Sequence, residues 1–186
     1  MVYLNAYMKA KIASRYKKNI YKQEYSKKIS IKDVVICELR DIASEEGALV
    51  EVMRLNGSGE SQVFPGFKVL QINYSVMFPG SVKAWHVHFK QDDVWYVTDS
   101  SPLLVGLVDL REKSPTLNVS MRFVLGVGRS KLLYIPKGVA HGVANLNLGI
   151  GEVFYFLNQH FSIEDSDENR LSWDHFGKDF WEMRKG

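Results

Sequence analysis

The chain has 186 residues, 46% of them hydrophobic and 12% aromatic, which fits one domain with a buried core and excludes a disordered chain. Its single cysteine, Cys37, excludes an internal disulfide and a cysteine-rich metal site. Residues 1–30 carry eight Lys or Arg and one acid, a charge of +7, so residues 31–186 sum to −4 within the net charge of +3.

Residues 1–30 are predicted to form a basic arm, and residues 31–186 the folded domain. Apolar residues recur at every fourth position of the arm, which favours a helix with one apolar stripe: Leu4, Met8, Ile12, Tyr16 and Ile20. The lysines would then form a solvated face. Charge alone supports a contact with anionic lipid or a partner subunit, and we do not expect a nucleic-acid partner.

From residue 29 onward the chain consists of short β-rich runs separated by turn residues. The runs cover residues 34–39, 48–55, 67–78, 93–97, 103–110, 121–127, 131–135 and 152–157. Many short strands with almost no helical period predict an all-β sandwich or barrel. We find no apolar run long enough to span a membrane and no secretory signal pattern, so we expect a cytoplasmic protein.

The C-terminal piece from Ser162 is first acidic and then aromatic. The charged run EDSDENR, residues 164–170, is predicted to be a solvated loop. The aromatic part is predicted to cap the barrel, in part as a short helix, with Trp173, Phe176, Phe180 and Trp181.

Two stretches carry histidines that a small barrel would bring together. In a strand, His86 and His88 point to one face, and the acids Asp92 and Asp93 follow them after a short turn. With Gly80 before them, this spacing matches the first cupin motif, with Asp in place of Glu and without the closing glycine. Residues 136–145, PKGVAHGVAN, match the core of the second motif and supply His141. The two together resemble the cupin double-stranded β-helix, a small jelly roll.

Within the cupins, residues 31–181 resemble the dTDP-4-dehydrorhamnose 3,5-epimerase family, as a diverged member. VDLREKSPT (108–116) and YIPKGVAHGV (134–143) are near-verbatim forms of its signatures. Residues 71–88 resemble the region of its Arg-Gly-Leu-His motif. EEGALVE (45–51) and LSWDHFGKDFW (171–181) are similar to its Glu-Arg-Gly segment and its terminal Trp-Asp region.

The resemblance implies an isomerase that inverts sugar carbons beside a ketone in a nucleotide-activated sugar. A base removes the acidified proton and an acid returns one on the opposite face. The family's base falls on His86, its tyrosine acid on Tyr155, and the acid that orients the histidine on Asp174 or, by an ungapped count, near His175. Its substrate-binding positions fall on Gln71, Asn73, Lys83 and His141. It further implies a homodimer and no cofactor.

The chain also departs from the family at charged positions. Lys83 replaces an arginine and loses its bidentate fork, while Glu46 replaces a second arginine and would repel a phosphate. The family lysine that stabilises the enolate falls on Val94 or, if the turn absorbs one residue, on Asp93. Val105 replaces an inward aspartate.

Two alternatives therefore stay open. His86, His88, Asp93 (or Asp92) and His141 form a set that suits Fe, Mn, Ni, Zn or Cu, in a metal-dependent isomerase or dioxygenase. A divalent ion could take the role of the missing lysine. If His88 instead faces solvent, this set is incomplete. The other alternative is a non-catalytic sugar-binding cupin.

Overall fold

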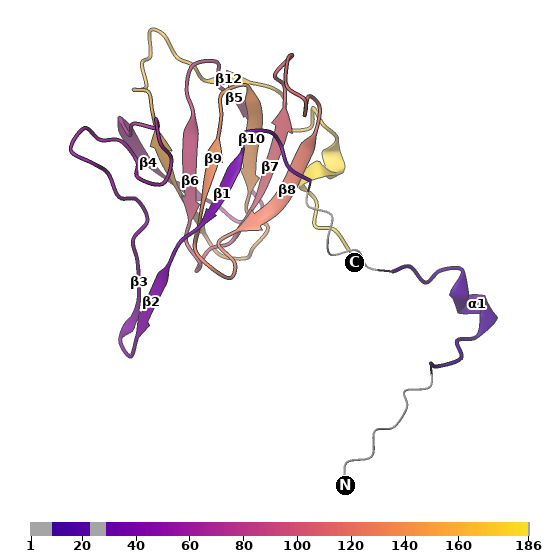
Figure 1. Cartoon of the computed structure of the whole chain (residues 1–186). Helices are drawn as coiled ribbons and strands as arrows, with labels where there is room; N and C mark the ends of the chain where they lie inside the picture. Colours follow the sequence, from indigo (N-terminus) through magenta and orange to yellow (C-terminus); the bar gives the residue numbers. More distant parts are fainter. Residues whose placement is uncertain (1–8, 23–28, 186) are drawn as a thin grey trace.

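Two facing five-stranded antiparallel sheets form a barrel in the computed structural model, which describes residues 9–22 and 29–185 (Figure 1). The first sheet runs in the order β1 (Val35–Glu38), β9 (Lys131–Ile135), β6 (Asp93–Val97), β11 (Gly151–Leu157) and β4 (Gln71–Met77). The second runs in the order β12 (Asn169–Arg170), β5 (Val82–Val87), β10 (Val139–Ala144), β7 (Leu103–Asp109) and β8 (Ser120–Leu125). The all-β prediction is confirmed.

Strand β7 shows how the sequence builds this layered structure. Leu103, Val105 and Leu107 point into the barrel and join the core between the sheets. Leu104 and Val108 alternate with them and pack on the outer face. Each fully buried side chain of this size stabilises the fold by about 1.5–3 kcal/mol. A run that is apolar at both alternations therefore marks a strand covered on both faces.

The C-terminal segment supplies the cover on the outside of the second sheet. The ring of Trp85 on β5 lies 4.8 Å from Phe180 and 4.7 Å from Trp181, between ring centroids. Trp181 belongs to the 3-10 helix η1 (Lys178–Trp181). The Trp173 carbonyl accepts hydrogen bonds from the indole N–H groups of Trp85 and Trp181. The predicted aromatic cap thus covers a sheet face.

The outer face of the first sheet is covered by residues between β3 and β4, with Phe64 and Phe67 buried against it. Before them, β2 (Asp41–Ser44) and β3 (Gly47–Val50) form a hairpin that projects away from the barrel (Figure 1). Ile42 and Leu49 are exposed on this hairpin, and Glu46 lies in its turn.

The N-terminal arm is described only in part. Within residues 9–22 its single helix is α1 (Ser14–Lys17), one turn with no buried residue. The predicted stripe residues Ile12, Tyr16 and Ile20 are exposed, while Leu4 and Met8 lie outside the described residues. The helix predicted for the arm is therefore limited to one turn over residues 9–22. Among the residues that the structure describes, no helix is both long and apolar enough to cross a membrane.

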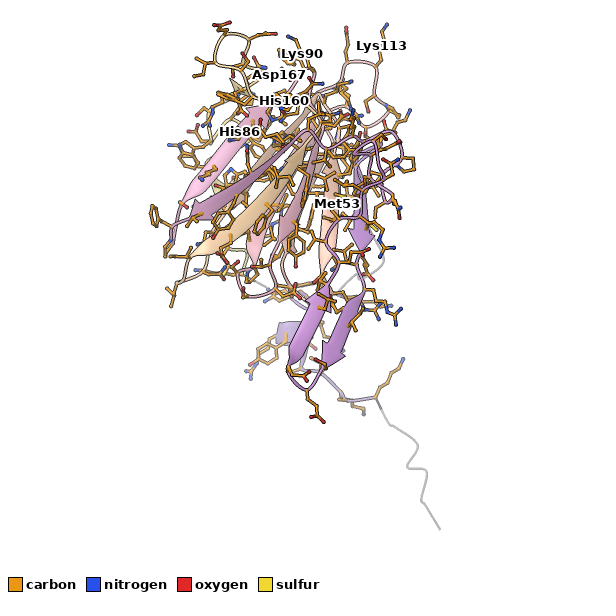
Figure 2. The ribbon with its side chains drawn as sticks, turned by 90° about the vertical axis from the view of Figure 1, so that its left-hand side faces the viewer. Met53, His86, Lys90, Lys113, His160 and Asp167 are labelled. Carbon is orange, nitrogen blue, oxygen red and sulfur yellow. The ribbon has the colours of Figure 1, made fainter. Side chains whose placement is uncertain are left out.

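Strand register aligns the site residues on the inside of the barrel. His86 on β5 lies opposite His141 on β10. On the facing sheet, Tyr155 of β11 lies opposite Trp95 of β6. Figure 2 shows His86 in the end of the barrel that also carries the loop residue Asp167, far from the projecting hairpin.

Candidate active site

A cavity of about 260 Å³ opens between the two sheets at this end of the barrel. Seven of the nine predicted site residues line it: Asn73, Lys83, His86, His88, Asp93, His141 and Tyr155. Side chains from both sheets therefore meet in one place, as the cupin resemblance implied.

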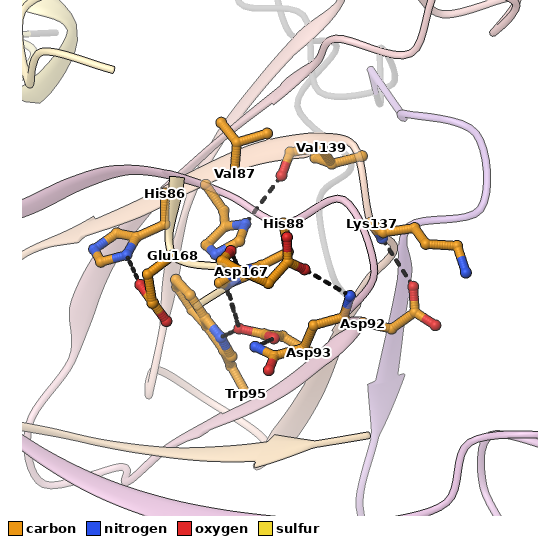
Figure 3. Close-up of polar contacts among 12 residues, drawn as sticks. His86, Val87, His88, Asp92, Asp93, Trp95, Lys137, Val139, Asp167 and Glu168 are labelled. Carbon is orange, nitrogen blue, oxygen red and sulfur yellow. Dashed lines mark hydrogen bonds and ion pairs between the residues drawn. The ribbon is translucent and has the colours of Figure 1, made fainter. Parts of the chain in front are cut away.

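His86 is held by a carboxylate that the sequence did not indicate. Its Nδ1 lies 3.0 Å from Oε2 of Glu168, and its side chain keeps 19% of its surface exposed to the cavity (Figure 3). A carboxylate accepts hydrogen bonds, so Nδ1 carries the proton and Nε2 keeps its lone pair. The hydrogen bond from His86 lowers the pKa of Glu168, which stays ionised. The pair can therefore act as a base with an orienting acid.

The carboxylate that contacts His86 is that of Glu168, and not that of the predicted Asp174. Asp174 does not line the cavity; its carboxylate accepts a hydrogen bond from the Ser172 hydroxyl. The alternative, His175, is exposed and packs on Phe176. Both residues lie after β12, whereas Glu168 directly precedes it.

The prediction that residues 164–170 form a solvated loop holds for residues 164–166, which are exposed and outside any strand, but not for the rest of the run. β12 pairs with β5, so that Arg170 lies opposite His86. The carboxylate of Asp167 accepts backbone N–H bonds from residues 89, 90 and 91. Burial raises the pKa of Asp167, but these three bonds outweigh it and lower the pKa. An acidic run of this kind gives no local signal of pairing, because a two-residue strand has no periodicity to detect.

Tyr155 reaches the cavity from the opposite sheet. Its ring packs edge-on against Trp95, with centroids 5.2 Å apart. Burial raises the pKa of Tyr155, so its phenol stays protonated well above neutral pH. A protonated phenol facing a cavity can donate a proton.

His88 points inward and forms a buried cluster with Asp93 and His141. Oδ2 of Asp93 lies 3.9 Å from Nε2 of His88 and 3.8 Å from Nε2 of His141. Three ligand atoms of these residues lie within 4.8 Å of one another, and His86 is not among the group. The four-ligand set predicted as the alternative is therefore reduced to three. Burial raises the pKa of Asp93 and lowers that of His141.

The structure also settles which acid faces the cavity. Asp92 accepts a hydrogen bond from the Lys137 backbone N–H at 2.8 Å (Figure 3). It accepts a second one from the Asn158 amide at 3.0 Å, and the two bonds connect the loop before β6 to its neighbours. Asp93, one residue later, points to the opposite side and inward. Val94, the other candidate for the lysine position, is buried on the outer face of the sheet.

The predicted substrate-binding residues divide into two groups. Asn73 and Lys83 line the cavity, whereas Gln71 lies behind Asn73 and donates a hydrogen bond to it at 2.9 Å. Lys83 Nζ donates to Ser75 Oγ at 2.6 Å. Arg170, which the sequence did not single out, also lines the cavity. Over residues 9–22 and 29–185, neither cation forms an ion pair with an acid of the chain.

Comparisons with known proteins identify the family. A model of the dTDP-4-dehydrorhamnose 3,5-epimerase family matches residues 28–179. The chain is 38% identical over 104 residues to a spore coat polysaccharide biosynthesis protein of Bacillus subtilis, covering 56% of this chain and 68% of that protein. It is 30% identical to a probable low-salt glycan biosynthesis epimerase of Haloferax volcanii, covering 78% of this chain and 90% of that protein.

Solved structures share the fold. A dTDP sugar isomerase from Desulfovibrio desulfuricans superposes with a TM-score of 0.65 at 26% identity, covering 83% of this chain and 91% of that one. A 3,5-epimerase from Bacillus anthracis superposes with a TM-score of 0.70 at 21% identity, covering 85% and 90%. The predicted cupin fold is confirmed, and an epimerase is favoured over a dioxygenase or a non-catalytic binder. The chain belongs to the dTDP-4-dehydrorhamnose 3,5-epimerase family, and is an enzyme of that family.

Proposed function

We propose that this enzyme inverts a carbon beside the ketone of a nucleotide-activated sugar, with His86 as the base and Tyr155 as the acid. One observation carries the assignment. A histidine held by a carboxylate and a protonated phenol come from facing sheets and line the same cavity. Proton removal and return on opposite faces of a sugar ring need two groups arranged in this way.

The reaction begins at His86. Its Nε2 lone pair removes the proton from the carbon next to the ketone, and the electron pair of the C–H bond moves into an enolate. Glu168 stabilises the imidazolium that forms, because its carboxylate accepts the Nδ1 proton in a charge-assisted hydrogen bond. A neutral imidazole is a suitable base near physiological pH.

Tyr155 completes the inversion. Its hydroxyl gives a proton to the opposite face of the same carbon, and the enolate electrons return to form the new C–H bond. The phenolate that remains and the imidazolium of His86 exchange a proton through solvent, which restores the enzyme. Only side chains of this chain take part in these proton transfers, so the proposal requires no organic cofactor.

The size and rim of the cavity support a sugar nucleotide as the substrate. At about 260 Å³ the cavity is smaller than the roughly 300–1,000 Å³ of most ligand pockets, so it suits the sugar ring and leaves the nucleotide outside. We assign the phosphates to Lys83 and Arg170, the two cations that line the cavity. Arg170 offers the planar fork that the replacement at Lys83 removes.

Exchange of solvent deuterium into the sugar tests this assignment. Purified enzyme is incubated in D₂O with a panel of dTDP-4-keto sugars, and deuterium is located by NMR. We expect exchange at carbons beside the ketone, loss of exchange in His86→Ala, and exchange without inversion in Tyr155→Phe. No exchange with any sugar of the panel, while circular dichroism shows an intact fold, would refute the proposal.

We further propose that the chain forms a homodimer. Apolar side chains are exposed on the projecting hairpin, at Ile42 and Leu49, and on the outer face of edge strand β4, at Ile72 and Tyr74. Such surfaces favour pairing with a second copy. Light scattering should give twice the mass of one chain, and in Leu49→Glu the measured mass should fall to that of one chain. The cytoplasmic location expected from the sequence stays a prediction.

A further inference from the structure

Three hydrogen-bond acceptors face one another in the buried floor of the cavity. His88 Nδ1 lies 2.7 Å from the backbone oxygen of Asp167, and His141 Nδ1 lies 2.9 Å from that of Val139. A carbonyl oxygen only accepts, so both Nδ1 atoms carry protons and both Nε2 atoms keep lone pairs. The Nε2 atoms of His88 and His141 lie 3.9 and 3.8 Å, respectively, from Oδ2 of Asp93.

The carboxylate of Asp93 is fixed in this position. Its Oδ1 accepts a hydrogen bond from the Gln91 amide at 2.8 Å, and its Oδ2 accepts one from the Trp95 indole at 3.0 Å. Asp93, His88 and His141 are all less than 5% exposed. Electron-rich atoms that converge in a buried place repel one another unless a proton or a metal ion lies among them, and the three atoms here come from residue types that commonly bind metal ions.

We propose that His88, Asp93 and His141 bind a divalent transition-metal ion. Two imidazoles and one carboxylate are ligands that suit Zn²⁺, Fe²⁺, Mn²⁺, Co²⁺ or Ni²⁺. Ligand atoms about 2.0–2.1 Å from a tetrahedral ion lie roughly 3.3 Å apart, so the two distances to Asp93 need to shorten by about half an ångström. The two imidazole nitrogens, which lie within 4.8 Å of each other, need to approach by at most about 1.5 Å. Each imidazole already donates its other N–H to a backbone oxygen, as metal-bound histidines do.

Two further features agree with an ion at this position. His86 lies outside the cluster because Glu168 holds it, so the base stays available when the ion is bound. Three protein ligands leave at least one coordination position of the ion for a ligand from the cavity. The proposal concerns ion binding and does not depend on the epimerase reaction.

The test uses the full chain without an affinity tag, purified without chelators. Metal content is measured by mass spectrometry, and affinity by calorimetric titration of Zn²⁺ and, separately, of Mn²⁺, Co²⁺ and Ni²⁺ into EDTA-treated protein. We expect about one ion per chain. His88→Ala and Asp93→Asn should weaken binding more than about 100-fold, beyond the 10–100-fold that loss of an outer hydrogen-bond partner causes.

Matched variants separate this site from others. His160 is exposed, so His160→Ala should bind the ion like the wild type. Tyr155→Phe should also keep the ion, which distinguishes ion binding from catalysis. Thermal melts identify any variant that fails to fold. The proposal is overturned if the folded wild type binds none of the four ions, or if folded Asp93→Asn binds them as tightly as the wild type.

Discussion

Replacing Glu168 with Gln tests the proposed pairing of this carboxylate with His86 as the base. The amide keeps the shape of the side chain and can still accept the Nδ1 proton of His86, but it has no charge to stabilise the imidazolium. Unit charges 3.0 Å apart at an effective dielectric of about 20 attract by about 5.5 kcal/mol. The Glu168 side chain is 38% exposed, so solvent reduces this value. Hydrogen bonds to charged groups contribute about 1.5–3 kcal/mol in mutational series.

A loss of this size in the transition state lowers kcat about 10- to 100-fold, at about 1.4 kcal/mol for each factor of ten. The assay is the initial rate of deuterium exchange at saturating sugar nucleotide, with KM measured in parallel. Asp174→Asn is the matched control, because the sequence pattern favours Asp174 as the partner, and it should change kcat less than twofold. If kcat falls in Asp174→Asn and is unchanged in Glu168→Gln, the assignment of Glu168 as the partner of His86 is wrong.

Three other variants test the assignment of the phosphates, the buried ion pair of the core and the stability of the fold at acid pH. Arg170→Ala should raise KM about tenfold with little change in kcat, and the effect should shrink at high salt because Arg170 is assigned to phosphate. Asp109→Asn should lower stability by about 3 kcal/mol, read as a fall in Tm of roughly 6–12 °C, because Asp109 is fully buried and pairs with Arg111. The lowered pKa of Asp167 means that its carboxylate stabilises the fold above about pH 4, and this stabilisation is lost as the pH falls through the pKa of the folded state. The free energy of unfolding of Asp167→Asn should therefore decrease less between neutral and acid pH than that of the exposed control Asp165→Asn.

The sequence predicted the site residues that lie within long strands and the motifs that join them. Period-two alternation places His86 and His88 on known faces of a strand, and PKGVAHGV fixes the turn before His141. Gly138 in that turn has φ of 78°, and a side chain there would lie 2.6 Å from Arg111. The backbone N–H of Gly138 donates to the His88 oxygen at 2.7 Å, so the two motifs are joined directly. Local patterns of this kind can be read without a structure.

What the sequence could not predict depends on pairing between distant segments. Arg170 belongs to the two-residue strand β12, whose position is fixed by β5 about 80 residues earlier in the chain, and Glu168 directly precedes that strand and contacts His86 of β5. The acidic character of residues 164–170 is typical of a solvated loop. The contacts that give part of this run another role are the backbone N–H bonds accepted by Asp167 and the hydrogen bond between Glu168 and His86, and both connect it to residues about 80 positions earlier. The choice between Asp92 and Asp93 likewise depended on which carboxylate met Asn158.

The charge of Asp93 links the two proposals and predicts the sign of one experiment. When His86 removes a proton, negative charge develops on the sugar, and a bare carboxylate in the cavity floor would oppose it. Neutralising a bare carboxylate with Asp93→Asn should therefore raise the exchange rate. If Asp93 instead holds an ion, the same substitution removes positive charge from the floor and should lower the rate, by at least tenfold. Exchange rates of Asp93→Asn, measured with and without added Zn²⁺, decide between these outcomes. A faster and Zn²⁺-independent variant would show that the enolate is stabilised from the rim, by Lys83 and Arg170, and not from the floor.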